Sequence, residues 1–234
     1  MSLAITWLGH SAFHVVLPGG KRIAFDPWLG NPNCPPAWAK PEALKPLDVI
    51  LVSHGHTDHS GDVIPVARAT NAPVVCVFEL GLFFTGKGLQ NVRDMAIGGT
   101  QEVAGLSVTM TYATHSGSIM DDGKVVYTGG ATGYVLRGPG VPTIYFAGDT
   151  GLFGDMKMIG ELYKPQIAFL PIGDHYTMGP FQAAIAARWL GVRQIVPMHW
   201  GTFPLLTGTP KALKAELADS GIDVLELKPG DTAK

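Results

Sequence analysis

The chain has 234 residues, of which 46% are hydrophobic and 15% are charged, and its formal net charge is −2 at pH 7. This length is enough to bury a sizeable core, and we expect one domain over residues 1–234. The near-neutral balance, without any run of Lys or Arg, excludes the basic field that nucleic-acid binding requires, so a small-molecule substrate is expected.

The charged fraction of the chain is well below the ~25% typical of soluble domains. It predicts that part of the surface is buried in a homo-oligomer. No apolar run reaches the ~20 residues of a membrane span, and the N-terminal residues lack the positive charge that opens a signal peptide. Two cysteines, Cys34 and Cys76, are too few for a disulfide framework. We therefore expect a cytoplasmic protein with no membrane partner.

Strand-like runs recur along the chain, at residues 4–8, 21–25, 48–53, 106–114, 143–147, 166–171 and 194–198. Helical patterns fall between them, at residues 61–69, 80–84, 154–163, 180–190 and 210–218. The stretch 116–130 is rich in Gly and Asp and is expected to be irregular. This order predicts an α/β chain with two sheets between helices, although a single mixed sheet is also compatible with it.

A dense cluster of metal-ligand residue types follows the third strand-like run. His54, His56, Asp58 and His59 fall within six positions. Imidazoles and carboxylates bind transition metals, and alternate residues of an extended loop can converge on one ion while Asp58 and His59 reach a second. Three of the chain's eight histidines lie in this window. Random surface placement does not explain such a concentration, so the cluster predicts a metalloenzyme.

Other strand-like runs also end in residues that ligate metals or move protons. These residues are His10, Asp26, His115, Asp149, His175 and His199. In layered α/β folds the loops at one end of the strands share a cleft. We therefore expect these side chains to meet the cluster.

The motifs and their order resemble the metallo-β-lactamase fold superfamily: His54-X-His56-X-Asp58-His59, then His115, then Gly148-Asp149-Thr150, then His199. The segments Trp7-Leu8-Gly9-His10-Ser11, Phe25-Asp26-Pro27-Trp28 and Pro197-Met198-His199-Trp200 further resemble metal-dependent hydrolases related to L-ascorbate 6-phosphate lactonase. The resemblance implies a four-layer αββα sandwich of two mixed sheets flanked by helices. It also implies a dinuclear metal site at the sheet edges.

The resemblance further implies a ligand set, with the first metal bound by His54, His56 and His115, the second by Asp58, His59 and His199, and Asp149 bridging. Two divalent transition-metal ions are expected, zinc before manganese, iron or nickel. A hydroxide shared by the metals, oriented by Asp58, would attack a small ester, lactone or phosphoester. Oxygen-reducing di-iron relatives typically carry a carboxylate at the position of His56, so this histidine favours hydrolysis over redox chemistry.

Three residues outside the ligand set are candidates for supporting roles. His175 is the expected proton donor to the leaving group, or else a hydrogen-bonded loop histidine. His10 would line the cleft. Asp26 would accept a hydrogen bond from a metal-bound imidazole, or else only begin the turn at Pro27.

Aromatic residues near the strand ends are candidates for substrate contact. Tyr176, together with Trp28, Trp200 and Phe203, would form an apolar wall of the cleft, although each could equally belong to the core.

Two other functions remain open alongside the hydrolase. The first is a phosphodiesterase or nuclease with the same ligands, although the chain lacks the basic surface of such enzymes. The second is a metal-binding protein without turnover, which the complete ligand set disfavours.

Overall fold

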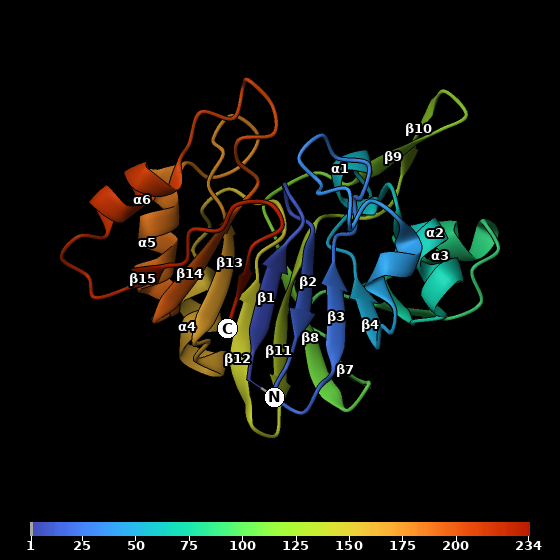
Figure 1. Cartoon of the computed structure of the whole chain (residues 1–234), viewed down its shortest axis with the longest axis horizontal. Coiled ribbons are helices and arrows are strands. Elements are labelled where there is room, and N and C mark those ends of the chain that lie inside the picture. Colours follow the sequence, from blue (N-terminus) through green and yellow to red (C-terminus); the bar gives the residue numbers. More distant parts are fainter. Residues whose placement is uncertain (1) are drawn as a thin grey trace.

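Two seven-stranded sheets pack face to face at the centre of the molecule, as a computed structural model that describes residues 2–234 shows (Figure 1). The strands of the first sheet, in spatial order, are β16 (Thr232–Ala233), β1 (Ala4–Trp7), β2 (Phe13–Val16), β3 (Arg22–Phe25), β4 (Val49–Leu51), β5 (Val74–Val77) and β6 (Val92–Met95). Neighbours from β16 to β3 are antiparallel, and those from β3 to β6 are parallel.

The second sheet is also mixed. Its strands, in spatial order, are β15 (Asp223–Val224), β14 (Gln194–Met198), β13 (Ile167–Pro171), β12 (Val141–Phe146), β11 (Thr132–Gly138), β8 (Leu106–Tyr112) and β7 (Thr100–Val103). Neighbours from β15 to β12 are parallel, and those from β12 to β7 are antiparallel.

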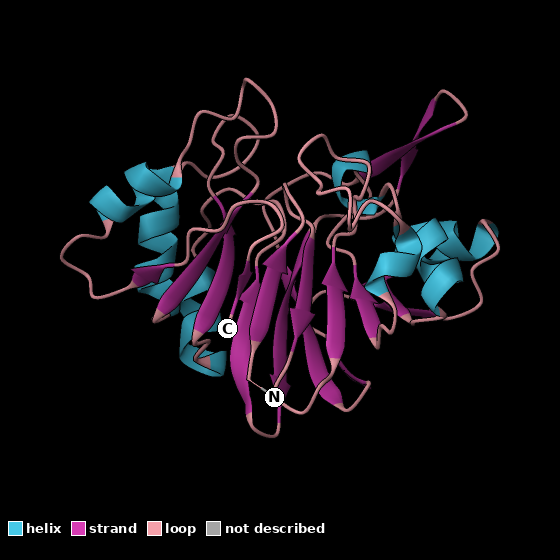
Figure 2. Ribbon diagram, in the orientation of Figure 1, coloured by secondary structure: helices cyan, strands magenta, loops and turns pink. Residues whose placement is uncertain are grey.

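Helices flank the two sheets on opposite sides (Figure 2). They are η1 (Pro41–Leu44, a 3₁₀ helix), α1 (Thr57–Ser60), α2 (Val63–Thr70), α3 (Phe78–Gly86), α4 (Met156–Tyr163), α5 (Pro180–Leu190) and α6 (Pro210–Glu216). Helix α3 contacts β5 and β6 of the first sheet, and α5 contacts β13 of the second together with α4 and α6. The predicted four-layer sandwich is therefore confirmed. Within residues 2–234, every helix is too short or too polar to cross a bilayer.

Aromatic side chains fill the space between the sheets. Phe25 of β3 stacks on Phe146 of β12 with ring centroids 4.5 Å apart, and Phe13 of β2 meets the edge of Phe169 of β13 at 4.9 Å. All four rings are fully buried, and replacing one such Phe by Ala costs about 3–5 kcal/mol. This packing fixes the strands whose ends carry the predicted ligands, since Asp26 directly follows Phe25.

The structure corrects the expectation for residues 116–130. They are not irregular, because β9 (Ser118–Asp121) and β10 (Lys124–Tyr127) form an antiparallel hairpin that projects from the body of the molecule (Figure 1). Asp122 and Gly123 form its turn with φ values of 47° and 74°, the left-handed pair that a two-residue hairpin turn requires. The Asp-Gly pair, followed by the β-branched and aromatic residues Val125, Val126 and Tyr127, is the sequence signal for this hairpin.

Candidate metal centre

The predicted ligands gather at one edge of the two sheets, where the loops lie above the strands in Figure 1. The cluster from His54 to His59 follows β4, His115 follows β8, Asp149 follows β12 and His199 follows β14. The loop between β1 and β2 reaches the same edge, since the His199 amide donates to the His10 carbonyl at 3.0 Å. Strand ends of both sheets therefore contribute to one site.

A first group of imidazoles contains His54, His56 and His115. His56 Nδ1 lies 3.0 Å from His54 Nε2 and 3.3 Å from His115 Nε2. One ring nitrogen of each residue lies within 4.8 Å of the others. Three nitrogens that face one another in this way are suited to a single cation such as zinc.

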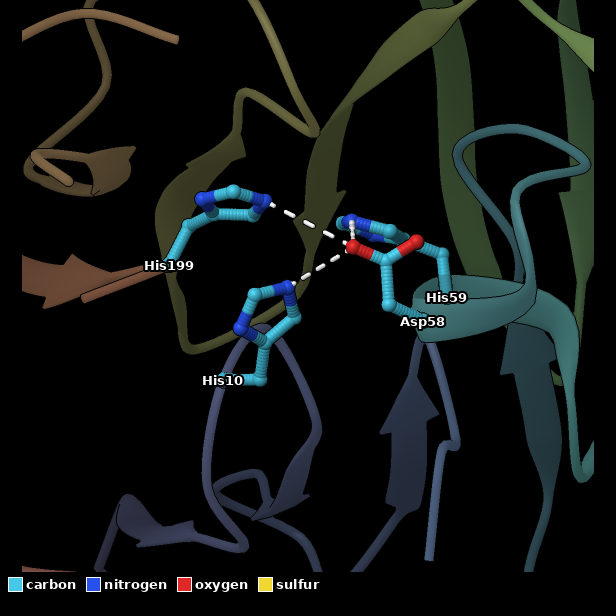
Figure 3. A group of neighbouring side chains, drawn as sticks. All are labelled: His10, Asp58, His59 and His199. Carbon is cyan, nitrogen blue, oxygen red and sulfur yellow. Dashed lines mark hydrogen bonds and ion pairs between the residues drawn. The ribbon is translucent and has the colours of Figure 1, made fainter. Parts of the chain in front are cut away.

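A second group surrounds Asp58 (Figure 3). Its Oδ2 lies 3.7 Å from His199 Nε2 and 3.8 Å from His59 Nε2. His10 Nε2 lies closer, at 3.0 Å from the same oxygen. The four side chains present ligand atoms within 4.8 Å of one another, so His10 joins the three residues that were predicted to bind the second metal.

Asp149 lies between the two groups. Its Oδ2 is 3.0 Å from His199 Nε2, 3.3 Å from His59 Nε2 and 3.7 Å from His115 Nε2. Only 2% of the residue is exposed, and its Oδ1 has no hydrogen-bond partner in the described part of the chain. This carboxylate is therefore placed where one group of ligands meets the other.

A buried carboxylate, Asp26, orients one ligand in each group. Its Oδ2 accepts hydrogen bonds from His59 Nδ1 at 2.7 Å and from Ser53 Oγ at 2.6 Å, and its Oδ1 accepts from the Ser53 amide at 2.7 Å. Because Ser53 gives its proton to Asp26, its oxygen accepts from His54 Nδ1 at 3.0 Å. Because each ring uses its Nδ1 for this hydrogen bond, Nε2 of His54 and of His59 is the nitrogen that would bind a metal.

The electrostatics of the donors fit bound cations. Burial lowers the pKa of His59, but the carboxylates of Asp149, Asp58 and Asp26 outweigh it and hold that pKa well above its ordinary value. Burial likewise opposes the charge on His199, yet Asp149 raises its pKa to about 9. Nε2 of His59 is nevertheless buried without a hydrogen bond to any of residues 2–234. In the metal-free protein the carboxylates thus attract protons to sites that divalent cations can take instead.

His10 supports the second group as the hydrogen-bond partner of Asp58. Burial is the main cause that lowers the pKa of His10 to about 4, so the ring is neutral. Since an ionised carboxylate only accepts, His10 Nε2–H donates to Asp58, and His10 Nδ1 accepts from Thr202 Oγ1 at 2.9 Å. His10 holds a φ of 54°, a left-handed conformation that non-glycine residues seldom adopt.

A cavity of about 740 Å³ opens over the two groups. Its lining combines ligand side chains with apolar ones and two small hydroxyl residues: His56, Asp58, His115, Asp149, His199, Trp28, Tyr176, Phe203, Pro204, Leu205, Thr57 and Ser116. Of the predicted wall residues, Trp28, Tyr176 and Phe203 are therefore in place. Trp200 is not, because it stacks on Trp7 with ring centroids 5.1 Å apart.

His175 lies apart from the ligands. Its side chain is exposed and packs against Tyr176 with ring centroids 4.4 Å apart, and it is not among the residues that line the cavity. Its role as a proton donor stays a prediction.

The site also contains residues that the sequence reasoning does not identify, among them Ser53, Thr202 and Leu205. Ser53 donates a hydrogen bond to Asp26 and accepts one from His54, and its position directly before the histidine cluster is a signal for this role. Thr202 and Leu205 lie in the loop between β14 and α6, and no periodic pattern marks either of them.

Comparison with known proteins agrees with this geometry. Residues 21–200 match the β-lactamase superfamily domain. The UPF0173 metal-dependent hydrolase of Koribacter versatilis is 51% identical over 231 residues, which are 98% of this chain and 97% of the relative. The relative in Solibacter usitatus is 46% identical over 229 residues, which are 97% of this chain and 98% of the relative.

A solved structure shows the same relationship. Igni18, a metallo hydrolase from the hyperthermophilic archaeon Ignicoccus hospitalis, superposes with a TM-score of 0.87 at 37% identity, over 99% of this chain and 97% of Igni18. The sandwich described above is therefore the metallo-β-lactamase fold. The chain belongs to the β-lactamase superfamily and, within it, to the UPF0173 metal-dependent hydrolases.

Proposed function

We propose that this hydrolase is dinuclear and cleaves a small ester, lactone or phosphoester. The observation that carries the proposal is the position of Asp149, whose Oδ2 lies within 3.7 Å of ligand nitrogens in both groups. Two ions ~3.5–4 Å apart need a shared anion, and this carboxylate supplies one. The ions would be divalent transition metals, zinc before manganese, iron or nickel.

The residues that would hold the two metals follow from the geometry of the groups. His54, His56 and His115 would hold the first, and Asp58, His59 and His199 the second, with Asp149 common to both. When bound, such ions make water nucleophilic near neutral pH and neutralise charge on the attacked oxygen.

The protein's own residues then orient and shield the reaction. Asp58, fixed by His10, would orient the nucleophile, because its Oδ2 accepts a hydrogen bond from His10 and its remaining lone pairs can accept from other partners. His175 would protonate the leaving group after movement of its exposed loop. A pH–rate profile unchanged in His175→Ala would remove that role.

The test is hydrolysis by the full chain loaded with zinc or manganese. An ester, a lactone, a thioester and bis-p-nitrophenyl phosphate form the panel, and metal-free protein is the blank. Asp149→Ala should abolish the metal-dependent rate, while Asp155→Ala, an exposed carboxylate at the start of α4, should leave it unchanged. Full activity of Asp149→Ala would contradict the bridging role.

The pattern of activity across the panel separates the competing functions. Preference for the phosphodiester would favour the phosphodiesterase alternative. Lack of turnover on every compound would favour a metal-binding protein.

A further inference from the structure

Several residues that line the cavity are large, apolar and partly exposed to water. Tyr176 is 51% exposed, Leu205 is 51% exposed and Phe203 is 36% exposed. All three line the cavity, together with Trp28. Large apolar side chains that surround one concave opening mark a place where an apolar ligand is bound.

The aromatic wall is held in place before any ligand arrives. Trp28 and Phe203 lie with ring centroids 6.1 Å apart, and both meet the ring of His10, at 5.3 Å and 5.5 Å. His10 is fully buried and hydrogen-bonded to Asp58 and Thr202. Trp28 and Phe203 thus pack on the same histidine that positions a predicted metal ligand, so an apolar group packed against these rings would lie next to the reacting centre.

The charges of the lining point to the same class of ligand. Within residues 2–234, no Lys or Arg lines this cavity. Its two carboxylates, Asp58 and Asp149, are both predicted metal ligands. A phosphate or carboxylate on the substrate, away from the metals, would therefore lose its hydration against apolar rings without gaining a counter-charge, which is costly.

We infer that the substrate is an uncharged ester or lactone with an aryl or alkyl group, which packs against Trp28, Phe203 and Leu205 while its scissile bond lies over the metal ligands. This inference rests on the proposed function, because it takes the metal centre as the site of cleavage. It narrows the substrate class by disfavouring sugar phosphates and nucleotides.

Binding of hydroxamates to the metal-loaded full chain tests the wall separately from turnover, because the hydroxamate group chelates divalent metals and its substituent alone samples the wall. Calorimetry should show benzohydroxamate binding roughly ten- to hundredfold tighter than acetohydroxamate, as expected for burial of an apolar ring. 4-Carboxybenzohydroxamate, which carries an additional anionic carboxylate at the far end of the ring, should bind more weakly than benzohydroxamate.

A charge introduced into the wall should reverse this order. Leu205→Arg is expected to bind the 4-carboxy compound more tightly than benzohydroxamate, whereas Leu205→Gln should only weaken both. Leu82→Arg is the matched control, because Leu82 is also exposed, at 58%, but lies on α3 and does not line the cavity. It should preserve the wild-type order.

The outcomes separate this inference from the proposed function. Equal affinity for acetohydroxamate and benzohydroxamate, or tighter binding of the 4-carboxy compound by the wild type, would overturn the inference even if esters are hydrolysed. Strong preference for the ring without hydrolysis of phenyl acetate or phenyl butyrate would support the wall and contradict the proposed reaction. No binding of any hydroxamate would overturn both.

Discussion

Asp26 Oδ2 lies 2.7 Å from Nδ1 of His59, and both side chains are completely buried. The same oxygen accepts from Ser53 Oγ, which in turn accepts from His54. One carboxylate therefore fixes the ring orientation of a ligand in each group. Hydrogen-bond partners of this kind govern how well an imidazole binds a metal, so a change at Asp26 is expected to weaken metal binding.

Asp26→Asn should weaken metal binding by about 10- to 100-fold. The Asn side chain has one oxygen where the carboxylate has two, so either His59 or Ser53 loses its hydrogen-bond acceptor. Competition against a chelator of known affinity measures the change. Asp223→Asn is the control, because Asp223 is an exposed carboxylate that, among residues 2–234, accepts a side-chain hydrogen bond from Gln194 alone, at 3.0 Å. Unchanged affinity in Asp26→Asn would contradict the assignment.

Replacement of His10 separates positioning of Asp58 from metal ligation. His10→Asn can retain the left-handed backbone but cannot reach Asp58, so we expect kcat to fall by about 10- to 100-fold while metal content is kept. Thr202→Val, which removes the hydrogen bond to His10 at 2.9 Å and a longer one to the Trp200 carbonyl at 3.5 Å, should have a smaller effect in the same direction. Kinetics together with metal analysis distinguish the two cases. Loss of one metal equivalent in His10→Asn would identify His10 as a ligand instead.

The glycine within the histidine cluster is required for space. A Cβ at Gly55 would overlap Thr128 Oγ1 and come within 3.1 Å of the Ser118 carbonyl oxygen. Gly55→Ala should therefore destabilise the protein by about 1–3 kcal/mol and lower its metal content, as chemical unfolding and metal analysis would show.

A second change should partly rescue this variant. Thr128 Oγ1 is buried and makes no hydrogen bond within residues 2–234, so Thr128→Ala removes the overlapping atom without breaking a bond. Gly55→Ala with Thr128→Ala should recover part of the stability and metal content. If neither the stability nor the metal content recovers, then close approach to the backbone, and not overlap with the Thr128 side chain, causes the loss in Gly55→Ala.

His14 provides a pH dependence remote from the ligands. It packs on Trp38, its Nε2 has no hydrogen-bond partner in the described chain, and burial, with a smaller contribution from Arg22, lowers its pKa to about 4. The unfolded chain, with an ordinary value near 6.5, binds a proton before the folded protein does. His14 therefore has little effect on the free energy of unfolding above pH 6.5, and it destabilises the folded protein as the pH falls toward 4.

The matched comparison is with His14→Gln, which does not titrate. Between pH 7 and pH 5 the metal-free wild type should lose ~2 kcal/mol more unfolding free energy than the variant. Urea titrations of both proteins give this difference, and the protonation of the metal ligands is common to both. Parallel pH dependence in the two proteins would contradict the account of His14.

Sequence reasoning located the ligands better than their surroundings. The concentration of imidazoles between His54 and His59 indicates a metal site from the sequence alone. The positions of His115 and His199 after predicted strands further indicate that both lie at the same edge of the sheets. The hairpin at residues 118–127 was missed because Gly and Asp were taken to indicate a loop, although the pair at its turn is what the strands require. The consecutive residues Val125, Val126 and Tyr127 of β10, all of high β propensity, are the stronger evidence.

Backbone conformation explains what the sequence could not supply. His10, Asp26 and His199 all have left-handed φ values, of 54°, 40° and 55°. Such conformations persist only where the surrounding structure fixes them, and the packing that does so here comes from segments far apart in the chain. Hydrogen bonds such as those of Thr202 to His10 therefore become visible only in three dimensions.

In the proposed site seven side chains hold two cations, and metal analysis of protein reconstituted with excess zinc and then freed of loosely bound ions counts those cations. We predict two equivalents per chain, falling to about one in His115→Ala, because three ligands of the second group and Asp149 remain. One equivalent or less in the wild type, or two retained in both His115→Ala and Asp149→Ala, would contradict it.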